Sequence, residues 1–313
     1  MKKIYLLLSL VVSSVSFGQQ ALPFSDSFSY PAGNLHTTTP WSVLGTPSAT
    51  DQILLDGSKV TFDAGGTDAQ VSLVSQTSGT VYYKLTLNVL TMAGVTDVNG
   101  GYLAGFTANA TTFGGTLWTK RVDDSTFNLG IETRTALGAL TTYTTGTYTT
   151  GTPYTIVVGY TFNTVGTADD TAKLWVNPTV SDEPTPLLTD THVGVDLTSI
   201  VSFFLRQDSA TETPSVSVDD LKVSTTFADL LSVNKFNNIS GLSIYPNPAK
   251  NTLNITSDSF ETKTVAIYNV LGAQVLSANV TNAPINIASL SKGVYVVKVT
   301  EEGKTATRKL VIE

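Results

Sequence analysis

Carboxylates are the side chains of this sequence best suited to acid–base chemistry. Enzymes that hydrolyse glycosidic bonds generally use two of them, about 5 to 9.5 Å apart. Between residues 20 and 230 the only glutamates are Glu132, Glu183 and Glu212, which share no local pattern. Aspartates form three adjacent pairs, Asp123-Asp124, Asp169-Asp170 and Asp219-Asp220. Because neighbours on a strand point to opposite faces, we expect no pair to share one substrate, and the sequence predicts no catalytic residue.

Thiol and imidazole chemistry is limited by composition. The chain has no cysteine, which excludes disulfides, thiolate metal sites and a cysteine nucleophile. Its two histidines, His36 and His192, lie far apart in the sequence and make a poor zinc site.

Calcium is the one cofactor that the sequence suggests. Asp169, Asp170 and Asn177 offer oxygen ligands, the type that Ca²⁺ prefers. No EF-hand spacing surrounds them, and a solvated acidic loop is the alternative.

Aromatic and cationic side chains are the candidates for ligand binding. A tryptophan face stacks on sugar C–H groups, and arginine donates to hydroxyls. The candidates are Tyr102, Trp118, Arg121, Trp175 and Arg206. Alternation places Arg206 on the same face as Ser202 and Phe204, which predicts a surface or groove position. For each tryptophan, burial in the core of a sandwich is the alternative.

The elements that position these residues are strands. Residues 83–89 alternate, with Leu85, Leu87 and Val89 on one face, and residues 155–162 are apolar on both faces. A slip in the apolar phase predicts a β-bulge near Asp219. The threonine-rich residues 141–150 suggest a hairpin that turns at Gly146. Many short strands with turns between them predict an all-β antiparallel jelly-roll sandwich.

Charge and composition divide the chain. Residues 1–18 have the basic start, short apolar core and small residues of a signal peptide. Residues 20–225 carry 19 acids and 8 bases, whereas residues 242–313 carry 5 acids and 7 bases. We therefore expect two domains joined by a linker at 226–241, in which residues 227–233 can form one helical turn. The net charge of −7 argues against a nucleic-acid partner.

The second domain contains four motifs in a fixed order. They include Tyr245-Pro246-Asn247-Pro248, Gly272, Gly293 with Tyr295, and a C-terminal strand that begins at Lys309. We expect the prolines to hold an extended entry and the glycines to supply turns. Strand candidates at 253–255, 265–268, 293–299 and 309–312 predict a small immunoglobulin-like β-sandwich.

In order, spacing and terminal position these motifs resemble the C-terminal sorting domain of the type IX secretion system of Bacteroidetes. The resemblance implies delivery through the periplasm to the medium or the outer-membrane surface. It also implies a secretion translocon and a sortase-like processing protease as partners, with release of the passenger or its attachment to surface lipopolysaccharide. A generic immunoglobulin-like module is the alternative.

The first domain resembles concanavalin A-like lectins and glucanases, including the laminin G-like group. The segments that carry the resemblance are 26–35 with Trp41, 117–121, 169–178 and 218–223. Relatives of this fold bind glycans, cleave them or mediate adhesion, so the fold does not choose among these functions. The glucanases place a glutamate pair in an E-x-D-x-x-E pattern, which this domain lacks.

The leading hypothesis from sequence is a non-catalytic secreted or surface protein that binds carbohydrate or mediates adhesion. A polysaccharide-degrading hydrolase or lyase with an atypical site is one alternative. A structural surface protein is the other.

Overall fold

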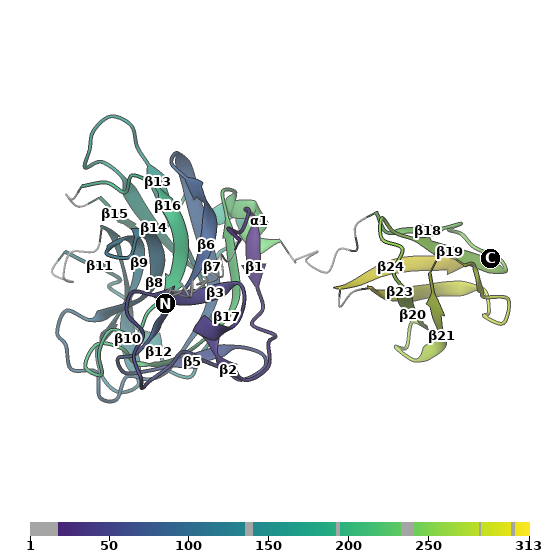
Figure 1. Cartoon of the computed structure of the whole chain (residues 1–313), viewed down its shortest axis with the longest axis horizontal. Helices are drawn as coiled ribbons and strands as arrows, with labels where there is room; N and C mark the ends of the chain where they lie inside the picture. The colour runs from purple at the N-terminus through teal and green to yellow at the C-terminus, as the bar shows by residue number, and fades with distance from the viewer. Residues whose placement is uncertain are drawn as a thin grey trace, which may run out of the picture. The chain divides into compact units, whose positions relative to one another are not determined.

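A computed structural model describes residues 18–134, 140–191, 195–232, 239, 241–281, 283–301 and 304–313 (Figure 1). The chain divides into two compact units, Met1–Ser232 and Val233–Glu313. The predicted signal peptide lies outside the described residues except for Gly18. Within the described part of the chain, no helix is long and apolar enough to cross a membrane.

The N-terminal unit consists of two antiparallel sheets. The nine-stranded sheet has the order β15 (Leu188–Asp190), β14 (Thr171–Val176), β13 (Tyr154–Phe162), β7 (Gly79–Thr91), β17 (Ser215–Ser224), β5 (Val60–Phe62), β4 (Leu54–Leu55) and β2 (Gly33–Asn34), with β1 (Phe24–Asp26) paired to β17. The eight-stranded sheet has the order β11 (Thr142–Tyr143), β10 (Thr126–Arg134), β9 (Thr112–Arg121), β8 (Gly101–Asn109), β16 (Ile200–Leu205), β6 (Asp68–Gln76) and β3 (Trp41–Leu44), with β12 (Tyr148–Thr149) paired to β10. The predicted all-β sandwich is confirmed.

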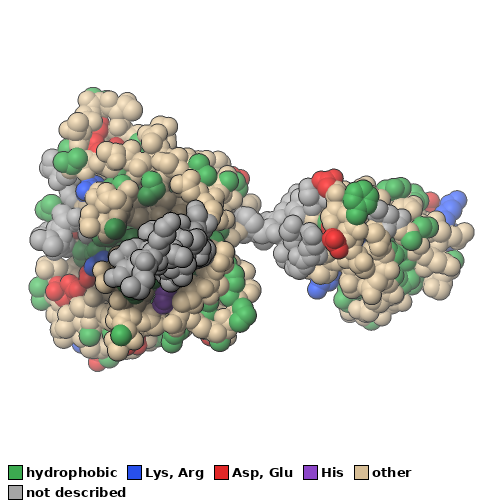
Figure 2. Space-filling view, viewed as in Figure 1, with side chains coloured by type: hydrophobic (Ala, Val, Ile, Leu, Met, Phe, Trp, Pro, Cys, Tyr) green, Lys and Arg blue, Asp and Glu red, His purple; other side chains and the backbone are tan. Residues whose placement is uncertain are grey.

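The main core lies between these sheets. Leu85, Leu87 and Val89 of β7 are fully buried, as their alternation predicts. Tyr83 of the same strand packs edge-on against Phe106, with ring centroids 5.1 Å apart. Burial of this apolar layer is the main stabilising contribution to a fold without disulfides. Outside the core, charged side chains are sparse on the face shown in Figure 2.

Two local predictions are confirmed and one is wrong. Strand β13 is buried on both faces, and the register of β17 against β7 shifts between Asp219 and Lys222. The predicted hairpin at residues 141–150 does not form, because β11 and β12 each pair with β10. The amide of Asn128 on β10 donates to the carbonyls of Thr144 and Gly146, so the connecting loop folds over β10.

A short helix ends the N-terminal unit. Helix α1 (Phe227–Leu231) forms where one helical turn was predicted. Phe227 and Leu230 are 1% exposed and pack against Tyr82 and Trp175 of the nine-stranded sheet. The first unit therefore extends to Ser232, beyond the boundary at residue 225 that composition suggests.

The C-terminal unit is a smaller pair of sheets. One contains β18 (Ser243–Tyr245), β19 (Thr252–Thr256) and β22 (Ile285–Asn286) in that order. The other has the order β21 (Gln274–Val280), β20 (Lys263–Tyr268), β23 (Gly293–Glu301) and β24 (Lys304–Ile312). All four strand candidates fall on observed strands. Lys263 and Glu301 form an ion pair of 2.8 Å at 0% and 4% side-chain exposure, so this unit contains a charge pair within its interior.

Candidate functional site

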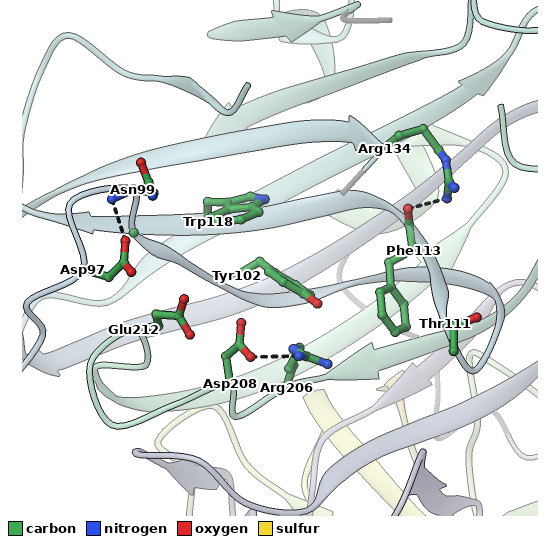
Figure 3. Close-up of a pocket in the computed structure, with 11 residues that line it drawn as sticks. Asp97, Asn99, Tyr102, Thr111, Phe113, Trp118, Arg134, Arg206, Asp208 and Glu212 are labelled. Carbon is green, nitrogen blue, oxygen red and sulfur yellow. Dashed lines mark hydrogen bonds and ion pairs between the residues drawn. The ribbon is translucent and has the colours of Figure 1, made fainter. Parts of the chain in front are cut away.

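A pocket of about 500 Å³ lies on the outer face of the eight-stranded sheet (Figure 3). This volume is within the usual range for small-ligand sites. Its lining residues come from β8, β9 and the turn between them, from the end of β10, and from the loops that precede β8 and follow β16. They are Asp97, Asn99, Gly100, Tyr102, Thr111, Phe113, Trp118, Arg134, Arg206, Asp208 and Glu212.

An aromatic layer forms the floor of the pocket. Tyr102 and Trp118 are cross-strand neighbours on β8 and β9, with ring centroids 5.0 Å apart. Phe204 of β16 lies 6.2 Å from Tyr102 and 5.0 Å from Phe113. Tyr102, Trp118 and Phe204 are at most 8% exposed, whereas Phe113 is half-buried. Phe113 is therefore the ring of this layer that offers most surface to a ligand.

Two glycines allow rings to lie close over the sheet. A Cβ atom on Gly105 would approach the Phe204 ring to 3.1 Å, and one on Gly130 would approach the Tyr143 ring to 2.6 Å. Tyr143 of β11 donates to the carbonyl of Asn99 at 2.5 Å, which ties this edge of the sheet to a loop of the pocket. The aromatic layer thus depends on strand positions that lack a side chain.

Arg206 connects the aromatic layer to two carboxylates. Its guanidinium lies 4.7 Å from the Tyr102 ring centroid and forms ion pairs with Asp68 at 3.2 Å and Asp208 at 2.8 Å. Burial raises the pKa of Asp68 to about 6, against the opposing effects of the Gln207 N–H and Arg206. The side chain of Arg206 is 23% exposed, so these contacts fix it within the pocket wall.

Three carboxyl groups gather at the pocket. Asp97 comes from the loop before β8, whereas Asp208 and Glu212 come from the loop after β16. Figure 3 shows Asp97 and Glu212 toward one end and Phe113 and Thr111 toward the other. Burial raises the pKa of Glu212, with a smaller effect from the nearby negative charges of Asp208 and Asp97, while a hydrogen bond from Ser209 Oγ at 2.8 Å opposes it. Glu212 therefore holds a proton to higher pH than an ordinary glutamate.

The hydrogen-bonding groups of the pocket differ in charge. Burial is the main reason why the pKa of Tyr102 lies well above its ordinary value, so its phenol stays neutral. Arg134 donates to the carbonyl of Phe113 at 2.7 Å. The arrangement combines an apolar floor of tilted rings with neutral, acidic and basic groups around it, which suits a ligand rich in hydroxyl groups.

Of the five binding candidates from sequence, the structure brings three together. Tyr102, Trp118 and Arg206 all line the pocket. Arg121 is exposed at the end of β9 and pairs with Asp124 at 2.8 Å. Trp175 lies in the other sheet beneath α1, where its Nε1 donates to the carbonyl of Asp182 at 2.8 Å. Trp175 is therefore a packing residue, as the alternative of burial predicts.

Sequence reasoning missed the other chemically active residues of the pocket. Asp97 lies more than 100 positions before Asp208 and Glu212, and the three residues share no motif. Their convergence results from the pairing of β8 with β16, which places the two loops side by side. The local sequence signal for one of these loops is Asn99-Gly100-Gly101, whose residue types favour a turn.

The predicted calcium ligands are only partly brought together. Asp169 and Asp170 precede β14 and lie with Asp196, their oxygen atoms within 4.8 Å of one another. The side chains of Asp169 and Asp170 converge because both residues lie in a loop, where neighbouring side chains need not point to opposite faces. Asn177 follows the far end of β14, about 20 Å along the strand, and its Oδ1 accepts from the Thr155 N–H. Asn177 therefore cannot share an ion with the aspartates, and calcium stays a prediction.

The sorting motifs have defined positions in the C-terminal unit. The side chain of Asn247, between Pro246 and Pro248, donates to the Lys309 carbonyl at 2.8 Å and accepts from the Val311 N–H at 2.9 Å. It thereby covers the free edge of β24. Gly272, at φ 81°, closes the turn before β21, as predicted. Gly293, predicted to supply a turn, instead begins β23 in extended backbone at φ 157°. Tyr245 ends β18, and Tyr295 is 8% exposed in the core.

Comparison with known proteins identifies the second unit. Residues 243–313 match the family described as "Secretion system C-terminal sorting domain". This match confirms the resemblance inferred from the four motifs. The chain thus carries a sorting domain, which indicates export across the outer membrane to the medium or the cell surface.

Two curated relatives are carbohydrate-active enzymes by name. "Beta-agarase D" of Zobellia galactanivorans is 38% identical over 73 residues, which are 23% of this chain and 15% of the agarase. "Ulvan lyase NLR42" of Nonlabens ulvanivorans is 26% identical over 147 residues, which are 46% of this chain and 26% of the lyase. The chain therefore spans about a quarter or less of the length of these relatives. The second alignment is longer than the C-terminal unit and so extends into the N-terminal unit.

Solved structures with a similar chain path include enzymes and carbohydrate recognition domains. Alginate lyase Aly36B has a TM-score of 0.36 at 16% identity and covers 64% of this chain and 97% of its own. The endo-1,3-beta-glucanase of Streptomyces sioyaensis has a TM-score of 0.38 at 12% identity, with coverages of 69% and 98%. The Emp47p carbohydrate recognition domain has a TM-score of 0.35 at 13% identity, with coverages of 67% and 100%.

Proposed function

We propose that the N-terminal unit binds a carbohydrate chain in the pocket of the eight-stranded sheet and acts as a non-catalytic binding or adhesive protein outside the cell. The observation that carries the proposal is the set of aromatic rings Tyr102, Phe113 and Trp118, which line a pocket of about 500 Å³ bordered by polar groups. Ligand sites are typically concave and apolar with a few placed polar groups. Sugar rings offer the matching surfaces, C–H faces and hydroxyl edges.

Phe113→Ala tests this proposal. Its ring is half-buried, so truncation removes ligand contact with less damage to the fold than truncation of Trp118. We expect the affinity of the mature chain for its glycan to fall about tenfold, equivalent to about 1.4 kcal/mol. Isothermal titration with glycans identified on an array measures the change.

Phe162→Ala is the matched control, because Phe162 is a half-buried ring of the nine-stranded sheet. It should leave the affinity unchanged. Equal effects of both variants, or no glycan binding by the parent protein, would contradict the proposal. In the latter case a structural role at the cell surface becomes the better hypothesis.

A polysaccharide-degrading enzyme is the second candidate, and two observations favour it. The pocket gathers Asp97, Asp208 and Glu212, and burial raises the pKa of Glu212, as a proton donor requires. The alignment with a protein named as an ulvan lyase also reaches the N-terminal unit. Release of new sugar ends from a polysaccharide, lowered at least about 100-fold by Glu212→Gln and unaffected by Glu183→Gln, would establish this function.

The C-terminal unit completes the proposal as a delivery signal. We propose that a secretion translocon recognises it and that a sortase-like protease removes it, with the passenger released or joined to surface lipopolysaccharide. The match of residues 243–313 to a sorting domain supports this role. Mass spectrometry of the protein recovered from culture would identify both processed ends, and an intact C-terminus on the exported protein would contradict removal.

A further inference from the structure

We propose that the pocket selects neutral, hydroxyl-rich polysaccharides and disfavours uronate or sulfated ones. This inference rests on the proposed carbohydrate binding and specifies its ligand class. It follows from the pairing of charges in the pocket. Binding of an anionic sugar is favoured by a cation that is not already paired with carboxylates of the protein.

The cation of Arg206 is already matched by the protein. Asp68 and Asp208 lie 3.2 Å and 2.8 Å from its two terminal nitrogens, and the face of the guanidinium lies over Tyr102. A carboxylate or sulfate of a ligand would have to displace one of these carboxylates or share the cation with it. Sharing brings like charges together at low dielectric, which is unfavourable.

The remaining charges of the pocket also disfavour anions. Its lining contains three acidic residues and two arginines. Asp68 adds a further carboxylate behind Arg206. Arg134, the second arginine, donates to the Phe113 carbonyl at 2.7 Å and keeps its positive charge, but the carboxylates outnumber the two arginines. The N-terminal unit as a whole has the same sign, since residues 20–225 carry 19 acids and 8 bases. An approaching polyanion therefore meets a negative field both near and far from the site.

The same groups suit neutral sugars. The carboxylates of Asp97 and Glu212 accept hydrogen bonds from hydroxyl groups, and a hydroxyl brings no charge that must be neutralised. The half-buried ring of Phe113 offers a stacking surface that does not depend on ligand charge. The same carboxylates therefore repel a uronate and accept hydrogen bonds from a hydroxyl group. One set of residues thus accounts for the selectivity between neutral and anionic sugars.

Affinity electrophoresis of the mature chain tests the inference. The probes are soluble neutral polysaccharides, laminarin and low-melting agarose, and the polyanions alginate and carrageenan, at low and at 0.5 M salt. We expect at least one neutral polymer to bind at least about tenfold more tightly than either polyanion, with little dependence on salt. Tighter binding of a polyanion would overturn the inference while leaving carbohydrate binding intact. Absence of binding to every polymer would remove both.

A pair of double variants locates the cause. Asp97→Asn with Glu212→Gln removes two charges from the pocket, and the ratio of polyanion to neutral affinity should rise at least about threefold. Asp63→Asn with Asp123→Asn removes the same charge from exposed loop positions, and the ratio should stay constant. An equal rise in both double variants would show that net charge rather than the pocket controls selectivity, and would overturn the assignment to this site.

Discussion

The outer faces of the two sheets each carry a buried tryptophan cluster, and the two clusters have different surroundings. On the nine-stranded sheet, Trp175 and Tyr82 are covered by Phe227 and Leu230 of α1. On the eight-stranded sheet, Trp118 and its neighbours form the floor of a pocket. Similar aromatic strands thus yield a closed packing contact on one face and a ligand-sized cavity on the other. Among the described residues, the difference is that a helix covers the rings of one face, whereas a pocket lies over the rings of the other.

The partners of Trp175, Lys222 and Arg206 differ between the two faces, although Arg134 on the pocket side also has a backbone partner. Trp175 Nε1 donates to the backbone carbonyl of Asp182, and Lys222 donates to the carbonyl of Ser232 beside α1. On the pocket side, Arg206 is held by side-chain carboxylates instead. The backbone carbonyls that accept from Trp175 and Lys222 are uncharged. The carboxylates that pair with Arg206 are charged and lie beside the cavity, where they can contact a ligand.

The largest effect should come from removing the cover. Phe227→Ala deletes a ring that packs 4.9 Å from Trp175 and 5.6 Å from Tyr82, and is expected to cost the N-terminal unit about 3 to 5 kcal/mol. Glycan affinity should not change. All three tryptophans lie in this unit, so the tryptophan fluorescence during urea unfolding reports on it alone. A stability loss below about 1 kcal/mol would mean that α1 is not an integral part of the unit.

A smaller effect should arise from the charges on the pocket side. Folding raises the pKa of Asp68 from 3.8 to about 6, mainly through burial, so the folded chain retains a proton that the unfolded chain loses between these values. The stabilising contribution of Asp68 is complete below about pH 4 and is lost as the pH rises to about 6. The free energy of unfolding, compared with that of Asp68→Asn, should fall by no more than about 3 kcal/mol across this window. A difference that increases with pH would contradict this account.

The two faces also show what the sequence can predict. Alternation over residues 83–89 and the phase slip near Asp219 are local, and both the buried face of β7 and the bulge in β17 follow from them. Alternation also placed Arg206 with Phe204, on the face that carries the pocket. Local pattern therefore predicts strand faces, because side-chain direction has a period of two residues.

The remainder of the site depends on contacts between distant segments. Asp97 and Glu212 approach each other only because β8 pairs with β16, and neither loop has a motif of its own. Trp118 and Trp175 occupy similar strand patterns, and only the docking of α1 distinguishes them. Asn177 is close to Asp169 and Asp170 in sequence, but β14 separates it from them in space.

The smallest effect should come from two glycines that lie beneath aromatic rings on opposite faces. A Cβ on Gly159 would approach the Tyr82 ring to 2.8 Å, and one on Gly130 would approach the Tyr143 ring to 2.6 Å. Tyr82 is held by Phe227 and cannot move away, whereas Tyr143 is half-buried on a two-residue edge strand.

Gly159→Ala should therefore cost about 1 to 3 kcal/mol through overpacking, and Gly130→Ala less, because its ring can swing outward. Movement of Tyr143 breaks its hydrogen bond to the Asn99 carbonyl, so Gly130→Ala should weaken glycan binding while Gly159→Ala leaves it intact. Urea midpoints and titration of the same two proteins measure both effects. If Gly130→Ala costs more stability than Gly159→Ala, or if Gly159→Ala weakens glycan binding more, the comparison is contradicted. The ring on the covered face would then move more readily than the ring on the pocket side.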